Sequence, residues 1–93
     1  MATLIDLTHA RRGRRLLHLM AERYGISWFL EGGREKFFKL DPGKIETAVE
    51  MCAHWLLLRT GSEPNATTRA WLKKDLRRTL IQRLAESMVN AGY

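Results

Sequence analysis

Apolar residues recur at helical spacing over the first quarter of the chain. Between about Leu7 and Tyr24 they form a stripe of Ala10, Gly13, Leu17, Met20, Ala21 and Tyr24, followed by the stop signal Gly25. Gly13 costs about 1 kcal/mol relative to alanine inside a helix, which weakens the first turns. The pattern predicts an amphipathic helix whose start is its least stable part.

Two aromatic-rich runs come next, Ile26 to Glu31 and Arg34 to Leu40, and Gly32-Gly33 lies between them. A two-residue glycine turn between such runs is a strong signal for a β-hairpin. An isolated hairpin is only marginally stable, so we expect one of its faces to pack on helices.

The predicted strand register decides which aromatic side chains share a face. Strands paired on the glycine turn place Trp28 opposite Phe37 on an apolar face. The other face carries Phe29 and Phe38 among basic groups. These two rings either lie under a helix or are exposed and able to stack unpaired bases.

A second helix is predicted from its N-cap Asp41 to about Thr60. Its C-terminal half is apolar almost all round, because Met51, Trp55 and Leu58 widen the main stripe. We therefore expect this helix at the centre of the core. Its polar face should consist of Glu46, Glu50 and His54.

Asn65 caps a third predicted helix that reaches about Val89, and its apolar face changes direction partway. With Leu72 at zero on an ideal helix, an early group centres at about 330° and consists of Trp71, Leu72 and Leu76. A late apolar group centres at about 170° and consists of Ile81, Leu84, Ala85 and Met88. One straight helix does not bury both in a monomer. We expect a dimer or partner interface at the late apolar group, a bend near Thr79, or fraying of the last turns.

Length and composition favour a single small basic domain spanning residues 1–93. The chain is 45% hydrophobic and 28% charged, which is typical of a globular protein. With the elements above, this predicts an α+β fold: one β-hairpin packed with three helices, the second central and the long C-terminal helix available to a partner. Cys52 is the only cysteine, so we expect a reducing cytoplasm and no disulfide. No secretory signal or membrane-spanning run is recognised, and no membrane contact is expected.

The main functional signal is the cluster Arg11-Arg12-Gly13-Arg14-Arg15, in a chain whose net charge is +6. Close like charges repel, so a fold that keeps four of them together often has an anionic partner. We expect backbone phosphates of RNA or DNA to be that partner. The predicted contacts are Arg11, Arg12, Arg14 and Arg15, then Arg34 and Lys36 from the hairpin, then Lys73, Lys74 and Arg77 from the third helix.

The alternative function is a non-enzymatic adaptor or inhibitor that docks on a larger protein. The late apolar group would then enter a groove on the target or pair with a second copy, and the basic groups would steer association to an acidic protein surface. A helix-turn-helix arrangement fits less well, because the connection before the third helix is long and contains Pro64. It would direct Thr67, Thr68 and Arg69 at the bases.

Catalytic and metal chemistry have little support in the sequence. Glu46, Glu50 and His54 share one helix face, but no second cluster of ligands accompanies them. No nucleophile is paired with His9 or His18, and no phosphate-cradling glycine motif is present. We expect no enzymatic activity, no metal and no cofactor.

Overall fold

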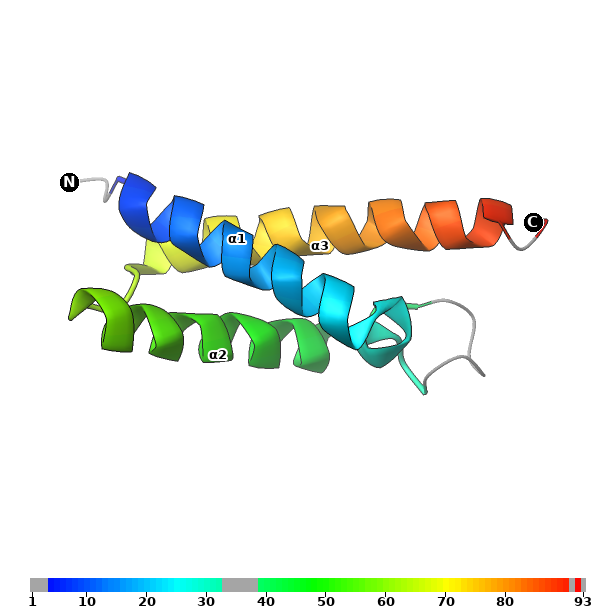
Figure 1. The fold of residues 1–93 in the computed structure, drawn as a ribbon, viewed down its shortest axis with the longest axis horizontal. Helices are drawn as coiled ribbons and strands as arrows, with labels where there is room; N and C mark the ends of the chain where they lie inside the picture. Colours follow the sequence, from blue (N-terminus) through cyan, green and yellow to red (C-terminus); the bar gives the residue numbers. More distant parts are fainter. Residues whose placement is uncertain (1–3, 33–38, 91, 93) are drawn as a thin grey trace.

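The computed structural model describes residues 4–32, 39–90 and 92. Over these residues the chain forms the helix α1 (Leu7–Tyr24), a short 3₁₀ helix η1 (Ile26–Phe29), α2 (Pro42–Thr60) and α3 (Ala66–Asn90). α1 crosses diagonally over α2 and α3, which run antiparallel to each other (Figure 1). Each of the long helices contacts the other two, so the fold is a small helical bundle.

The predicted α+β fold is wrong, because the described part of the chain contains helices and no strand. Most of the first expected strand is the 3₁₀ helix η1, and the only pairing here is an isolated bridge between Leu30 and Leu40. This bridge has a different register from the predicted pair of Trp28 and Phe37. Residues 33–38, which carry most of the second expected strand, lie outside the described ranges.

Packing explains why η1 replaces a strand. Phe29 is fully buried, and the ring of Trp28 meets it edge-on with 4.7 Å between centroids. Lys44 of α2 donates to the carbonyl of Trp28 at 3.3 Å and lies 4.6 Å from its ring centroid. A strand would send neighbouring side chains to opposite faces, whereas η1 directs several of them onto the helices.

The helix ends predicted from capping residues are confirmed. Asp41 accepts from the backbone N–H of Gly43 at 2.8 Å. The sequence pattern had not indicated a cap for α1, where the Asp6 carboxylate accepts from the backbone N–H of Thr8 and His9. α2 ends at Gly61, whose φ of +81° is left-handed. Asn65 Oδ1 accepts from the N–H of Thr68 at 2.8 Å, as expected of an N-cap.

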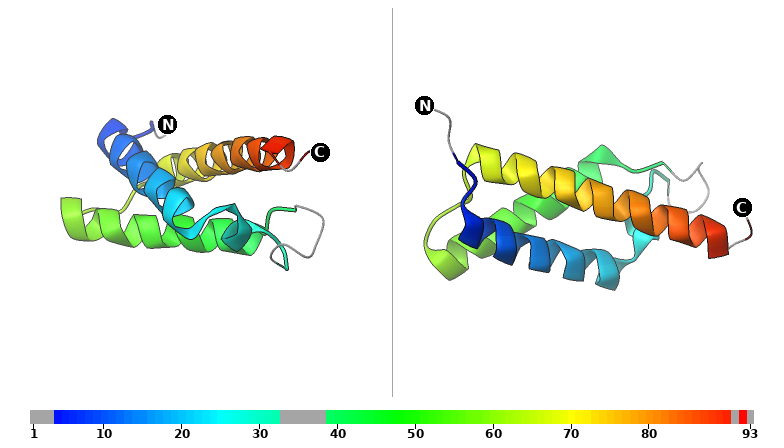
Figure 2. Two further views of the ribbon diagram at one scale, coloured as in Figure 1. Left: turned by 45° about the vertical axis from the view of Figure 1, so that its right-hand side comes forward. Right: turned by 90° about the horizontal axis from the view of Figure 1, so that it is seen from above.

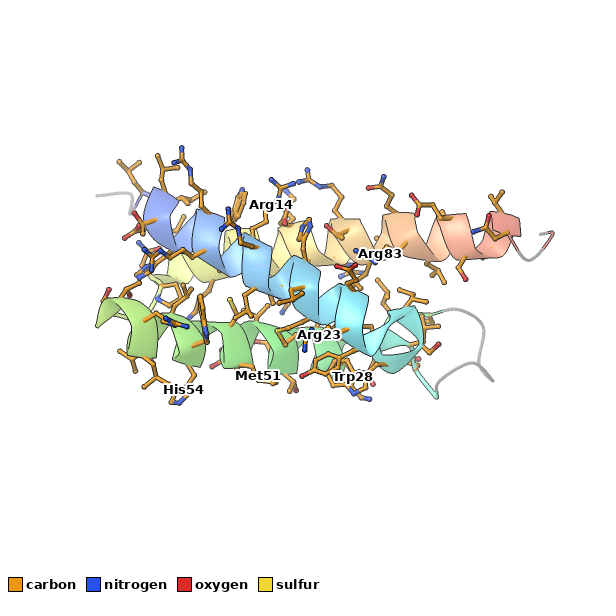
Figure 3. The ribbon with its side chains drawn as sticks, viewed as in Figure 1. Arg14, Arg23, Trp28, Met51, His54 and Arg83 are labelled. Atoms are coloured by element: carbon orange, nitrogen blue, oxygen red, sulfur yellow. The ribbon has the colours of Figure 1, made fainter. Side chains whose placement is uncertain are left out.

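The expected central position of the second helix is wrong. α2 buries one face, but Met51 and Leu58 on its outer side are 46% and 72% exposed. Figure 3 shows Met51 and His54 pointing away from the bundle. Glu46, Glu50 and His54 are exposed as predicted. The core instead lies between all the helices and comprises Leu17, Met20, Ala21, Phe29, Ile45, Ala48, Val49, Cys52, Leu56, Leu72, Leu76 and Leu80.

Gly13 lies on the face of α1 that packs against both α2 and α3. A Cβ atom there would stand 2.9 Å from Leu72 Cδ1 and 3.3 Å from Cys52 Sγ. The Cys52 thiol also donates to the Gly13 carbonyl at 3.6 Å. The glycine that was expected to weaken the first turns therefore permits the close crossing of the helices.

α3 is one continuous helix past Thr79, and its C-terminal end extends beyond α1 (Figure 2). The predicted bend is therefore not observed. Its buried side chains are Thr68, Leu72, Asp75, Leu76 and Leu80, and those of the following turns are exposed or half-buried. Among the described residues, none of the helices combines the length and apolarity that crossing a bilayer requires.

Candidate nucleic-acid interface

The predicted arginine cluster lies on the exposed side of α1. Arg11, Arg12, Arg14 and Arg15 are all exposed, and the stripe of α1 between them faces the core. Because successive helical residues point about 100° apart, the cluster divides around the helix. Part of it lines a groove toward α3 and part lines a groove toward α2.

The α1–α3 groove is an open depression of about 800 Å³. α3 contributes Arg83 to it, and Figure 3 shows Arg14 and Arg83 along the boundary between these two helices. The remaining lining residues are Arg11, Arg15, His18, Leu19 and Glu22. The groove is thus cationic, with a single carboxylate among its lining residues.

The α1–α2 groove, on the other side of α1, has a volume of about 410 Å³. The guanidinium of Arg59 from α2 lies 5.4 Å from the ring centroid of the half-buried Trp55, in cation–π range. The other lining residues are Arg12, Arg15, Leu16 and Leu19. This groove combines cations with an aromatic and aliphatic surface.

A buried carboxylate connects α3 to the arginine cluster. Asp75 is 2% exposed, and its Oδ1 accepts from Arg78 at 2.8 Å. Its Oδ2 lies 3.2 Å from His18 Nε2 and 3.4 Å from Arg14 Nε, both on α1. A buried carboxylate needs such partners, because desolvation of an unpaired charge is costly. Asp75 therefore joins α1 to α3 and fixes Arg14 at the rim of the groove.

The geometry around His18 does not form a catalytic relay. Asp75 Oδ2 and Thr79 Oγ1 both lie 3.2 Å from the same ring nitrogen, Nε2. In a relay, the nucleophile and the orienting carboxylate bind opposite nitrogens of the imidazole. The contacts are those of an Nε2–H group that donates to Asp75, with the threonine hydroxyl beside it.

The basic groups on the opposite side of the bundle are largely neutralised. Lys73 Nζ lies 2.6 Å from Glu46 Oε2, and Arg69 binds Glu50 at 2.6 Å and Glu63 at 3.3 Å. Lys73, a predicted phosphate contact, thus belongs to an ion-paired surface between α2 and α3. The structure does not bring it to the grooves beside α1.

The remaining predicted contacts are dispersed. Lys74 and Arg77 are exposed at about 200° and 140° on the helical projection of α3, on its outer side. Neither lines a groove beside α1. Arg34 and Lys36 lie outside the described residues.

The arginines nearest the grooves differ from those on the opposite side in their pairing. Within residues 4–32 and 39–90, no carboxylate forms an ion pair with Arg11, Arg12 or Arg15. The same holds for Arg59 and Arg83 in that part of the chain. Unpaired arginines are therefore grouped along α1, while Lys74 and Arg77 on the outer side of α3 are likewise without a carboxylate partner among the described residues.

The late apolar group stays at the surface of α3. Ile81 is 52% exposed, Ala85 is exposed, and Leu84 and Met88 are half-buried. The neighbouring Val89 is 70% exposed. These side chains form an apolar surface on the part of α3 that extends past the core.

Burial excludes base contacts by two residues that the alternative interpretations had offered for them. Phe29, a candidate for stacking bases, is 0% exposed, in agreement with the alternative that it lies under the helices. Thr68, which a helix-turn-helix would direct at the bases, is also 0% exposed, and its hydroxyl accepts from the N–H of Asp6 at 3.0 Å. Phe38 lies outside the described residues.

The described residues hold no group of three histidine, cysteine, aspartate or glutamate side chains able to bind a metal ion. The lone thiol is equally unsuited to nucleophilic chemistry. Burial raises the pKa of Cys52 from 9.0 to about 11, so the reactive thiolate is scarce at neutral pH.

Sequence reasoning missed Asp75, Trp55, Arg59 and Arg83 as parts of this surface. One signal was available for Asp75: it projects at about 300°, inside the early apolar arc of α3 centred at about 330°. An acidic residue in a buried stripe requires a cationic partner. The other three residues join α1 only through the way the helices cross. The chain matches no family model, no curated protein and no solved structure.

Proposed function

We propose that the protein binds the phosphate backbone of a nucleic acid along the exposed side of α1. The observation that carries the proposal is the convergence of arginines from all the long helices there. Arg12, Arg59 and Arg83 represent α1, α2 and α3 in the two grooves. Arginine suits this role, because its planar guanidinium remains charged and matches phosphate oxygens.

The distribution of ion pairs supports this surface over the general positive charge of the protein. A net charge of +6 by itself gives weak attraction to any polyanion. Here Arg69 and Lys73 between α2 and α3 already have carboxylate partners, whereas Arg11, Arg12 and Arg15 on α1 have none among the described residues. Arg14 is the member of the cluster that is paired, with Asp75. A phosphate chain therefore gains most at Arg11, Arg12 and Arg15, where no ion pair must first be broken.

The experiment is a fluorescence-anisotropy titration against single-stranded RNA, single-stranded DNA and the matching duplexes. Salt is varied from about 50 to 200 mM, because each phosphate contact contributes about 0.7–0.9 to the slope of log affinity against log salt. We expect Arg11→Ala/Arg12→Ala to weaken binding and lower that slope by about 1.5.

The matched control is Arg69→Ala/Lys73→Ala, which removes the same charge from the ion-paired surface. It should change the slope much less than the α1 variant. Equal slopes for the two variants would show that only net charge matters, and an absence of saturable binding near physiological salt would refute the proposal.

A second candidate function is docking on a protein, favoured by the exposure of the late apolar group. Lys74 and Arg77 lie one to two turns before Ile81 on the same outer side of α3. An apolar stripe preceded by cations fits an apolar groove with an acidic rim. A photo-crosslinker beside Ile81 would capture the partner, and Ile81→Asp and Lys74→Ala must each weaken the same complex.

A further inference from the structure

We infer that the α1–α2 groove holds an unpaired base, so that the protein selects single-stranded over duplex nucleic acid. This inference rests on the proposed function and adds the class of nucleic acid. It starts from the composition of the groove, where the Trp55 ring and Leu19 lie among Arg12, Arg15 and Arg59. Such a mixture offers a base an apolar, aromatic surface and its phosphates nearby cations.

The planar groups of the groove carry the argument for stacking. The guanidinium of Arg59 lies 5.4 Å from the Trp55 ring centroid, and guanidinium planes and indole rings both stack on bases. Leu19 is 44% exposed beside them and adds an apolar contact. The volume of about 410 Å³ lies within the range of roughly 300–1,000 Å³ found for small-ligand sites.

The two grooves present different chemistry on either side of α1. The α1–α3 groove has arginines but no aromatic residue among its lining residues, so it offers phosphate contacts only. The α1–α2 groove offers both, and Arg15 lines the two. A single strand that follows α1 can place phosphates on the shared arginines and turn one base toward Trp55. A duplex presents its phosphates to the same arginines but keeps its bases stacked and paired.

The test compares Trp55→Leu with the wild type on single strands and duplexes of equal length at one salt concentration. Leucine retains apolar volume against the core, which Trp55 also contacts, but removes the aromatic surface. We expect affinity for single-stranded RNA and DNA to fall by about 5- to 150-fold, the range for one base–aromatic stack, and duplex affinity to stay unchanged. Trp55→Phe should restore most of the loss.

The matched control is Trp71→Leu, because Trp71 is also half-buried against the core but lines neither groove. Circular dichroism confirms that each variant is folded at the temperature of the titration. If Trp55→Leu leaves single-strand affinity unchanged, or weakens duplex binding equally, the inference is overturned.

The inference and the proposed function fail in different ways. If Arg11→Ala/Arg12→Ala lowers the salt slope while Trp55→Leu has no selective effect, phosphate binding stands and the base site is wrong. A wild-type preference for duplex also overturns the base site alone. If the wild type binds none of the four nucleic acids near physiological salt, the proposed function itself is refuted.

Discussion

Replacing Gly13 by alanine tests the packing on which the whole arginine surface depends. Two effects of the added methyl group oppose each other. Alanine favours the helix by about 1 kcal/mol over glycine. However, the new Cβ would stand 2.9 Å from Leu72 Cδ1, closer than carbon atoms approach without a shift.

The net effect follows from whether Leu72 can move. Its side chain is 1% exposed and lies inside the core, so its terminal methyl groups have little free space. Inserting a methylene-sized group into a packed core costs about 1–3 kcal/mol. After subtraction of the gain in helix propensity, we expect Gly13→Ala to lower the free energy of unfolding by about 1 kcal/mol.

The assay is equilibrium urea denaturation followed by circular dichroism. Leu72→Ala alone should cost about 2–5 kcal/mol, because it leaves a cavity. In that background Gly13→Ala should be stabilising, since the methyl group then enters empty space and the gain in helix propensity remains. The sign of the Gly13→Ala effect therefore depends on the residue opposite.

Gly43→Ala is the control, because Gly43 lies in the exposed first turn of α2 and its added Cβ would meet only Asp41 Oδ1 at 3.2 Å. It should be neutral or stabilising by up to about 1 kcal/mol. If Gly13→Ala stabilises the protein as much as this control, and shows no coupling to Leu72→Ala, then the close crossing of the helices is not a packing constraint.

Three further predictions concern charge, the end of the core and the thiol. Asp75→Asn should lower the free energy of unfolding, measured in urea, by about 1–3 kcal/mol. It should also raise the affinity for nucleic acid, because Arg14 is released from its ion pair with Asp75. A lower affinity in a folded variant would contradict this and mean that Asp75 positions Arg14 for phosphate. Leu80→Ala should lower the free energy of unfolding by about 2–5 kcal/mol, because Leu80 is buried, and Ile81→Ala should lower it by less than about 0.5 kcal/mol, because Ile81 is 52% exposed. Urea denaturation at two protein concentrations measures both effects. A loss of stability in Ile81→Ala that depends on protein concentration would indicate a dimer. Burial raises the pKa of Cys52 from 9.0 to about 11, which means that the folded protein favours the neutral thiol. The stabilisation of the folded protein by this neutral thiol is intact below pH 9 and is lost as the pH rises toward 11. About 1 kcal/mol of unfolding free energy should therefore disappear by pH 10 in the wild type and not in Cys52→Ala, as measured by urea denaturation across that range.

The helix ends could be predicted because capping is a local property. Asp41 and Asn65 satisfy backbone groups within the next three residues, so their roles can be read without knowledge of the fold. The prediction of a β-hairpin was wrong because the structure of that segment depends on tertiary contacts. A glycine pair and aromatic residues permit a strand, but the burial of Phe29 against the helices is a tertiary contact that favours η1.

The candidate site also contains residues that the sequence could identify and residues that only the tertiary structure brings together. The arginine cluster on α1 could be identified because its charges are adjacent in the sequence. Its relation to Arg59 and Trp55, which follow about forty residues later, arises only where α1 crosses α2. Lys73 looked equivalent to those arginines, but the packing of α3 on α2 pairs it with Glu46. Local sequence thus determined which residues form the long helices and where charge is dense. The crossing of the helices decided which charges meet and which are neutralised, because contacts between helices join residues that lie far apart in the chain.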